Sequence, residues 1–114
     1  LYFIPGSHHT TRFENPGIGK NMDAIFDFYP EYRKSKSVAA PMKAGSCSFH
    51  NGLTIHGAGA NMTNGFRRAF TCAYMPDGAV FNGIQNILTD EQVNHMNIGD
   101  VLNNDKQNPL IYKS

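Results

Sequence analysis

The stretch SFHNGLTIHGAGANMTNGFRRAFTCAYMPDG, residues 48–78, contains β-forming runs separated by a glycine-rich turn. Its last run, RRAFTCAYM at residues 67–75, predicts a strand, and successive side chains of a strand point to opposite faces. The face of Arg68 carries bulky, mostly apolar residues, whereas the face of Arg67 carries only small ones. The small residues are Ala69, Thr71 and Ala73. We therefore expect Arg67 to face a cavity.

His56 ends the β-forming run before the turn. Alternation places it on the same face as Thr54, with Leu53 and Ile55 on the other face. The glycines between the two runs permit a tight turn, so an inward histidine and an inward arginine can contact one small ligand. Imidazole is a common ligand of iron or zinc, and guanidinium pairs bidentately with carboxylates. His56 and Arg67 together therefore predict a site for a metal-bound organic acid.

Composition limits the classes of protein to which the chain can belong. With 114 residues, of which 40% are hydrophobic and 17% charged, it is at most one soluble globular domain. The net charge of +1, without a Lys/Arg run, predicts neither nucleic acid nor a membrane as partner. The only two cysteines, Cys47 and Cys72, predict small buried residues in strands rather than a disulfide framework. We expect a reducing compartment, the cytoplasm.

Turn residues and caps divide the chain into short elements. We expect strands at residues 1–4, 37–40, 47–50, 53–56 and 67–75, and helices at 21–28 and 90–96. Asn21 is the predicted cap of the first helix, and Thr89 with Gln92 has the spacing of a capping box. Pro30 ends the first helix, and Pro5-Gly6-Ser7 forms a turn. The pattern predicts a mainly β fold, an antiparallel sandwich or barrel with one or two short helices.

The histidine, Gly-x-Gly, Asn and Thr of this stretch, with an arginine eleven positions after the histidine and FIPGSH upstream, resemble a known family. The chain is similar to the C-terminal half of the phytanoyl-CoA dioxygenase family of Fe(II)- and 2-oxoglutarate-dependent oxygenases. The resemblance covers nearly the whole chain and is strongest at residues 1–8 and 45–112. It implies a double-stranded β-helix, or jelly roll, of which residues 1–114 are the C-terminal part.

The resemblance also implies roles for individual residues. His56 matches the distal iron histidine, and Arg67 matches the arginine that binds the far carboxylate of 2-oxoglutarate. In such enzymes O₂ and 2-oxoglutarate are consumed, and a C–H bond of a small organic molecule or acyl thioester is hydroxylated. His50 and Thr71 are candidates for the substrate pocket or for contacts to a ligand. His50 shares a polar face with two serines, and a hydrogen-bonded core position explains it equally well.

The chain departs from the family pattern at two points. The family supplies its other two iron ligands from a His-x-Asp or His-x-Glu motif, and no histidine of this sequence is followed by an acid two residues later. We expect that motif upstream of Leu1, and we expect the 114-residue chain alone to bind iron poorly and to be inactive. Ala58 stands where many relatives carry a serine that can hydrogen-bond the cosubstrate.

Three alternatives stay open at this stage. The chain can be a non-catalytic half-barrel that pairs with a partner chain or with a copy of itself through an exposed sheet edge. It can also be a relative that keeps only an anion pocket at Arg67. Arg67 itself can instead form a structural ion pair with Asp77 or Asp100. His8 and His9 are expected to be solvated loop histidines.

Overall fold

A computed structural model describes residues 1–14, 17, 19–86 and 88–112 of the chain. The chain forms two compact units, Leu1–Phe70 and Thr71–Ser114. Each unit has a few buried residues of its own and is described below by itself.

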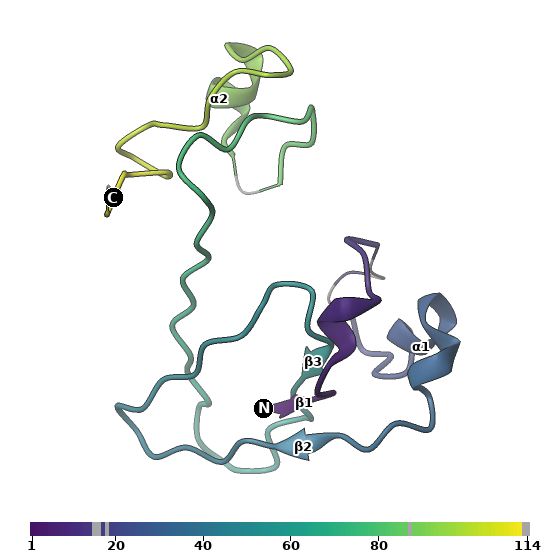
Figure 1. Ribbon diagram of the computed structural model, residues 1–114. Helices are drawn as coiled ribbons and strands as arrows, with labels where there is room; N and C mark the ends of the chain where they lie inside the picture. The colour runs from purple at the N-terminus through teal and green to yellow at the C-terminus, as the bar shows by residue number, and fades with distance from the viewer. Residues whose placement is uncertain (15–16, 18, 87, 113–114) are drawn as a thin grey trace. The chain divides into compact units, whose positions relative to one another are not determined.

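The first unit contains a small antiparallel sheet, shown in Figure 1. Its strands are β1 (Tyr2–Phe3), β2 (Val38–Ala39) and β3 (His56–Gly57), in the order β2-β1-β3. Phe3 is paired with Val38 on one side and with His56 on the other. Pairing continues one residue further at each side, because Ile4 N donates to Ile55 O at 2.9 Å and Ala40 N donates to Leu1 O at 2.9 Å. The predicted strands at residues 1–4 and 37–40 are thereby confirmed.

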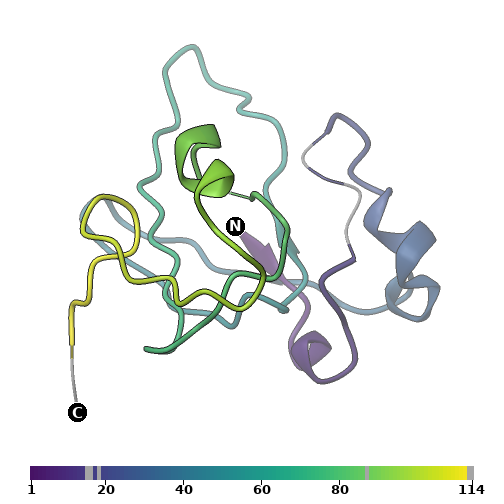
Figure 2. The same ribbon diagram turned by 90° about the horizontal axis from the view of Figure 1, so that it is seen from above.

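The turn after β1 is confirmed as well. Gly6 has φ 78°, a left-handed conformation that glycine adopts without a steric penalty. The 3₁₀ helix η1 (Ser7–His9) follows directly, as the purple ribbon shows in Figures 1 and 2. This turn brings Ser7, which has 0% of its surface exposed, next to the chain that leads into β3.

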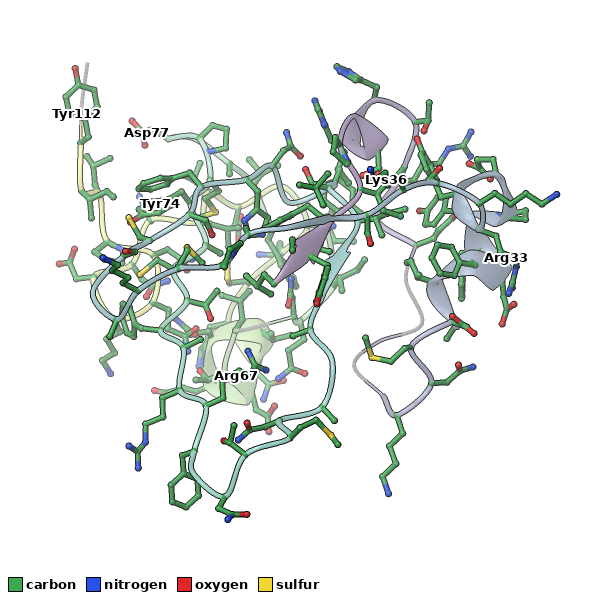
Figure 3. The ribbon with its side chains drawn as sticks, turned by 90° about the horizontal axis from the view of Figure 1, so that it is seen from below. Arg33, Lys36, Arg67, Tyr74, Asp77 and Tyr112 are labelled. Carbon is green, nitrogen blue, oxygen red and sulfur yellow. The ribbon has the colours of Figure 1, made fainter. Side chains whose placement is uncertain are left out.

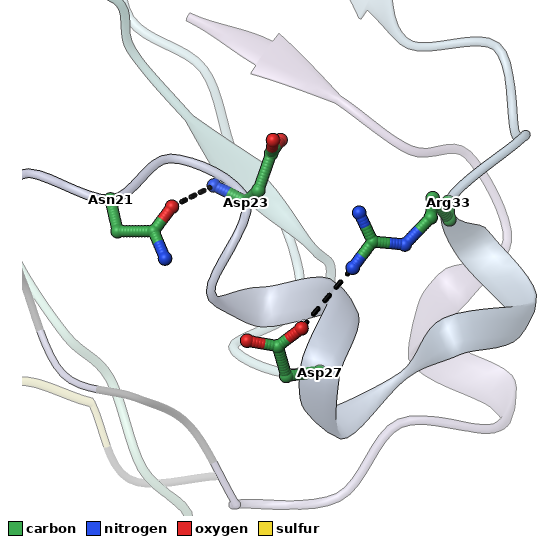
Figure 4. A network of polar contacts seen from close by, with 4 residues as sticks. All are labelled: Asn21, Asp23, Asp27 and Arg33. Carbon is green, nitrogen blue, oxygen red and sulfur yellow. Dashed lines mark hydrogen bonds and ion pairs between the residues drawn. The ribbon is translucent and has the colours of Figure 1, made fainter.

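The first predicted helix is present but shorter than expected. The α-helix α1 spans Ile25–Phe28, not residues 21–28. Asn21 Oδ1 does accept a bond from Asp23 N at 3.0 Å, and Figure 4 shows this contact beside the Arg33–Asp27 ion pair. After Asn21, backbone hydrogen bonds join residues three positions apart: Ala24 N donates to Asn21 O, and Phe26 N donates to Asp23 O. An α-helix joins residues four positions apart, so this turn is tighter than an α-helix. Pro30 ends α1 as predicted and begins the 3₁₀ helix η2 (Pro30–Tyr32).

Two predicted strands are not formed, and a third is displaced. Residues 47–50 and 67–75 have no strand or bridge assignment, and β3 lies at His56–Gly57 instead of 53–56. Asn51 draws the start of that run into a turn, since its Oδ1 accepts from Leu53 N at 2.9 Å and its backbone O accepts from Thr54 N at 2.9 Å. A strand exists only where its backbone groups pair with a neighbour, and residues 67–75 have no such neighbour among the residues that the structure describes.

Cys47 and Cys72 lie in these unpaired runs. Both thiols are free and exposed, so the prediction that they are buried strand residues was wrong. The prediction depended on strands at residues 47–50 and 67–75, and without a paired sheet neither cysteine has a layer to pack against.

The second unit contains the helix α2 (Asp90–Asn94) and an antiparallel bridge between Val80 and Val101. The predicted capping box is confirmed: Gln92 N donates to Thr89 Oγ1 at 3.2 Å, and Thr89 N donates to Gln92 Oε1 at 3.0 Å. Phe81 and Leu88 are the buried apolar side chains of this unit among its described residues. The helix ends two residues before the predicted residue 96.

The observed fold is a small antiparallel sheet with short helices and much irregular chain. The antiparallel pairing agrees with the predicted class, and the jelly roll stays a prediction. Among residues 1–14, 17, 19–86 and 88–112, no helix has the length and apolar character needed to cross a lipid bilayer.

Candidate functional site

The His56 side chain is held at the edge strand β3. Its ring stacks on Phe3 of the paired strand β1, with 5.9 Å between the ring centroids. Its Nδ1 lies 2.8 Å from the backbone oxygen of Thr54. A carbonyl oxygen can only accept, so Nδ1 carries a hydrogen, and in the neutral ring Nε2 keeps a free lone pair. The side chain is exposed, and Nε2 is therefore available to a metal ion or to another hydrogen-bond donor.

His50 lies directly beside His56. The two ring centroids are 4.5 Å apart, and the His50 ring also meets Phe3 edge-on at 5.1 Å. His50 is largely exposed, and the partial desolvation of its ring lowers its pKa from the ordinary value of 6.5. The neighbouring His56 lowers that pKa further, because a second positive charge nearby disfavours protonation. The three rings form a cluster in which His50 favours the neutral state.

An open hollow of about 480 Å³ adjoins this cluster. Phe3 and His50 are part of its wall, and the wall is mostly apolar. Its other lining residues are Pro5, Gly6, His8, Val38, Ser48, Phe49, Asn51 and Thr54. Residues of the sheet, of the turn after β1 and of the unpaired run at residues 47–50 thus border an open hollow beside His50.

Arg67 lies in the exposed chain near the end of the first unit, and Figure 3 labels its side chain. Within the described part of its own unit it makes no hydrogen bond or ion pair. Its neighbour Arg68 instead stacks over the Phe66 ring, with 5.0 Å from the guanidinium carbon to the ring centroid. Thr71 is exposed at the start of the second unit. Sequence reasoning placed His50, His56, Arg67 and Thr71 at one site. Among the described residues of the first unit, the rings of His50 and His56 are in contact, and a joint site with Arg67 and Thr71 stays a prediction.

In the described ranges, no group of three or more His, Cys, Asp or Glu side chains could hold a metal ion. His8 and His9 lie close to each other, with 4.0 Å between ring centroids. The donor set near β3 is therefore two imidazoles. It fits one part of an iron site rather than a complete coordination shell.

Sequence reasoning missed the residues that hold this region in place. Ser7 Oγ accepts a bond from Ile55 N at 2.8 Å, and Thr11 Oγ1 donates to Ser7 O at 3.1 Å and also contacts Leu53 O. Both Ser7 and Thr11 are buried. The sequence signal for this role was the presence of two hydroxyl residues, Ser7 and Thr11, shortly after the Pro5-Gly6 turn. Such side chains often form hydrogen bonds to nearby backbone groups.

Comparison with known proteins gives one consistent result. The family model described as phytanoyl-CoA dioxygenase (PhyH) matches residues 1–69. The peroxisomal phytanoyl-CoA dioxygenase of Rattus norvegicus is 35% identical over 80 residues, which are 65% of this chain and 23% of the rat protein. The human protein of the same name is 31% identical over 77 residues, 65% of this chain and 23% of its own length.

A probable phytanoyl-CoA dioxygenase of Caenorhabditis elegans is 31% identical over 83 residues, 68% of this chain and 26% of that protein. The matched region thus spans about a quarter of the length of these curated relatives. No solved structure gives a significant match to the chain.

Proposed function

This chain belongs to the phytanoyl-CoA dioxygenase family, and we propose that it forms part of an Fe(II)- and 2-oxoglutarate-dependent oxygenase. The proposed reaction is hydroxylation of a small organic molecule or acyl thioester, with O₂ and 2-oxoglutarate as cosubstrates. The observation that carries the proposal is the state of His56, whose Nδ1 is bonded to Thr54 O while Nε2 is left free on an exposed ring.

His56 is the proposed iron ligand of this chain. A neutral imidazole with its second nitrogen bonded to a carbonyl is the usual form of a metal-binding histidine. When bound, iron(II) supplies the centre at which the oxygen chemistry takes place. One imidazole does not bind iron tightly, so the proposal places the other two ligands, a His-x-acid pair, in a part of the protein outside residues 1–114.

Arg67 is the proposed partner of the far carboxylate of 2-oxoglutarate. Its guanidinium is exposed and has no acidic partner within the described residues of its unit. A free guanidinium can bind a carboxylate through two parallel hydrogen bonds. His50 and Thr71 are proposed to contact the substrate or a ligand, and the hollow beside His50 gives the substrate a place next to His56.

We propose further that residues 1–114 are the C-terminal part of one jelly-roll domain. The unpaired run at residues 67–75 keeps the alternation of a strand and has backbone groups open to a neighbour. Strands from the rest of the protein would pair with it. In that assembly Arg67 and His56 would face the same interior, as the alternation of both runs predicts.

A second candidate is a non-catalytic half-barrel that associates with a partner chain or with a copy of itself, and a separate alternative is a relative that keeps only an anion pocket at Arg67. The half-barrel is favoured by large apolar side chains that are exposed in the first unit: Phe66 is 87% exposed and Phe70 is 94% exposed. A protein that pairs with a partner chain through this region would bury these residues without any iron chemistry.

The compartment is also a proposal. We propose that the protein lies in the cytoplasm, because its two cysteines are free thiols and the cytosol keeps thiols reduced. The names of the rat and human relatives place those proteins in the peroxisome. Imaging of the full-length protein with a fluorescent tag distinguishes the two locations.

The test of the main proposal uses the full-length protein with Fe(II), 2-oxoglutarate and a panel of acyl thioesters. We expect succinate in wild-type protein, and a hydroxylated product, heavier by one oxygen atom, with the correct substrate. Mass spectrometry measures both. Wild-type protein that forms no succinate with any substrate, yet forms a stable complex through residues 67–75, would favour the half-barrel instead.

Hydrogen exchange separates the two structural versions. In the isolated 114-residue chain we expect the amides of residues 67–75 to exchange rapidly, because they have no backbone partner in the described chain. In the full-length protein alone they should become protected if the jelly roll is completed within one polypeptide. Protection that appears only after a second chain is added supports the half-barrel.

A further inference from the structure

The peptide group between Thr54 and Ile55 has a hydrogen-bond partner on each side. Its N–H, from Ile55, donates to Ser7 Oγ at 2.8 Å. Its oxygen, from Thr54, accepts from His56 Nδ1 at 2.8 Å. A peptide group is planar and stiff, so fixing the direction of the N–H also fixes the direction of the C=O. The hydroxyl of Ser7 and the ring of His56 are thus joined through one rigid unit.

The position of the Ser7 side chain is fixed by its burial and by its hydrogen bonds. Its side chain is fully buried, and its hydroxyl donates to Ile4 O at 2.8 Å. With the hydroxyl proton committed to Ile4, the oxygen presents its lone pairs to the Ile55 N–H. A further bond, Ile4 N to Ile55 O at 2.9 Å, joins the same two segments. Ser7 therefore has one well-defined orientation.

We propose that Ser7 is a positioning residue that holds His56 in the Nδ1–H tautomer through the Thr54–Ile55 peptide group. The inference rests on the proposed function of His56 as an iron ligand, and it adds a residue that makes no hydrogen bond to His56 itself. A neutral imidazole can carry its hydrogen on either nitrogen. Only the Nδ1–H form leaves Nε2 free to bind a metal ion.

The first experiment measures the tautomer of His56 without any metal. Nitrogen-15 NMR of the metal-free, full-length protein distinguishes Nδ1–H from Nε2–H in each histidine. We expect His56 to be in the Nδ1–H form in wild-type protein and in a mixture of both forms in Ser7→Ala. A Ser7→Ala protein that keeps the pure Nδ1–H form would overturn the inference.

Thr11→Val is the matched control. It removes a hydroxyl that bonds to Ser7 O and to Leu53 O in the same buried region, and it leaves the Ile55 N–H with its partner. We expect Thr11→Val to keep the Nδ1–H form. A shift as large as that of Ser7→Ala would mean that general loosening of the turn sets the tautomer, which contradicts the proposed role of Ser7.

Ser7→Cys covers the case in which Ser7→Ala does not fold. It keeps a side chain of similar shape at the buried position and replaces the hydroxyl with a weak acceptor. A mixed tautomer in Ser7→Cys supports the inference, and an unchanged tautomer overturns it.

Anaerobic titration of full-length protein with Fe(II) separates this inference from the proposed function. We expect Ser7→Ala to weaken iron binding by roughly 10-fold, the lower end of the usual effect of losing a partner that orients a metal-binding histidine. His56→Ala with wild-type affinity would refute the iron ligand, whatever the tautomer. Loss of affinity in His56→Ala, with unchanged affinity and tautomer in Ser7→Ala, would refute only the role of Ser7.

Discussion

The runs that contain His56 and Arg67 have the same kind of sequence pattern and adopt different structures. Residues next to His56 are bonded to β1 and to the buried Ser7, and the His56 ring is packed against Phe3. Residues 67–75 pair with no strand in the described part of the chain, and their side chains are exposed. The difference shows that alternation of apolar and polar residues predicts which face of a chain is apolar. Whether the chain forms a strand depends on a second strand that pairs with its backbone.

The same difference separates the two halves of the proposed site. The iron-binding half is held by contacts between segments that are far apart in the sequence, because β1 and Ser7 bond to the chain around His56. The cosubstrate-binding half has an arginine whose position is not set by a hydrogen bond in its own described unit. We expect substitutions in the two halves to act differently, and the predictions below test this from the largest expected effect to the smallest.

His56→Ala should abolish succinate formation by the full-length protein, because it removes the proposed iron ligand. Mass spectrometry of succinate and anaerobic Fe(II) titration measure the loss. His95→Ala is the matched control, since His95 Nδ1 also lies close to a backbone oxygen, that of Glu91, at 2.6 Å in the second unit. Turnover that persists in His56→Ala would remove the iron-binding half from the comparison.

Arg67→Ala should weaken 2-oxoglutarate binding by roughly 2 kcal/mol, the scale of a lost charge-assisted pair. That is about a 30-fold rise in the dissociation constant, with Fe(II) affinity unchanged. Isothermal titration of 2-oxoglutarate measures it. Arg68→Ala serves as control, because Arg68 stacks on Phe66 and should matter little for the cosubstrate. Equal losses in the two variants would mean that net charge, not position, attracts the cosubstrate.

Tyr29→Phe tests how firmly hydroxyl groups hold the ordered half. Tyr29 is 6% exposed, and its OH accepts from Arg12 N at 2.9 Å and lies within bonding distance of the Arg12 and Glu14 carbonyl oxygens. We expect a loss of about 1 kcal/mol in the free energy of unfolding, measured by urea denaturation. Tyr2→Phe removes an exposed hydroxyl and should change little. Equal stability of the two variants would contradict the proposed anchoring.

The pH dependence of His50 is the smallest expected effect. Its pKa is below 6.5, through burial first and His56 second, so the unfolded chain binds more protons than the folded one as the pH falls. The stability that neutral His50 contributes is full above the unfolded pKa and is lost as the pH drops through the lower, folded pKa. NMR titration of His50 measures the shift. In His56→Ala the pKa should rise but stay below 6.5, and a value at 6.5 would show that charge, not burial, is the main cause.

Local chemistry explains which elements of the fold were predictable. The Pro5-Gly6-Ser7 turn, the capping box of Thr89 with Gln92 and the helix end at Pro30 each depend on neighbours within four residues. Asn21 shows the limit of such reasoning. Its side chain makes the expected bond to Asp23, but the following turn closes on the third residue and delays the α-helix to Ile25.

In the candidate site, too, the sequence predicted single residues but not the contacts between distant ones. The role of His56 as a metal ligand stays a prediction from the sequence, and the structure adds that its Nδ1 lies 2.8 Å from Thr54 O. The sequence also predicted His50 as a candidate, but it did not predict the contact of His50 with His56. The contact between these two rings, separated by six positions, comes from the turn at Asn51 and from Phe3 across the sheet. Phe3 and Ser7 lie far from the run 48–56 in the sequence, so the pattern of that run could not predict their contacts with it.

The sequence by itself determined the family, the two candidate groups for iron and cosubstrate, and the short turns and caps. Only the tertiary structure decided which predicted strands pair, that Ser7 is buried against the chain leading to His56, and that three rings meet at β3. The physical reason is the separation, along the sequence, of the groups that interact. Turns and caps are satisfied by atoms a few residues away, whereas ladders and ring contacts need backbone and side chains from distant parts of the chain.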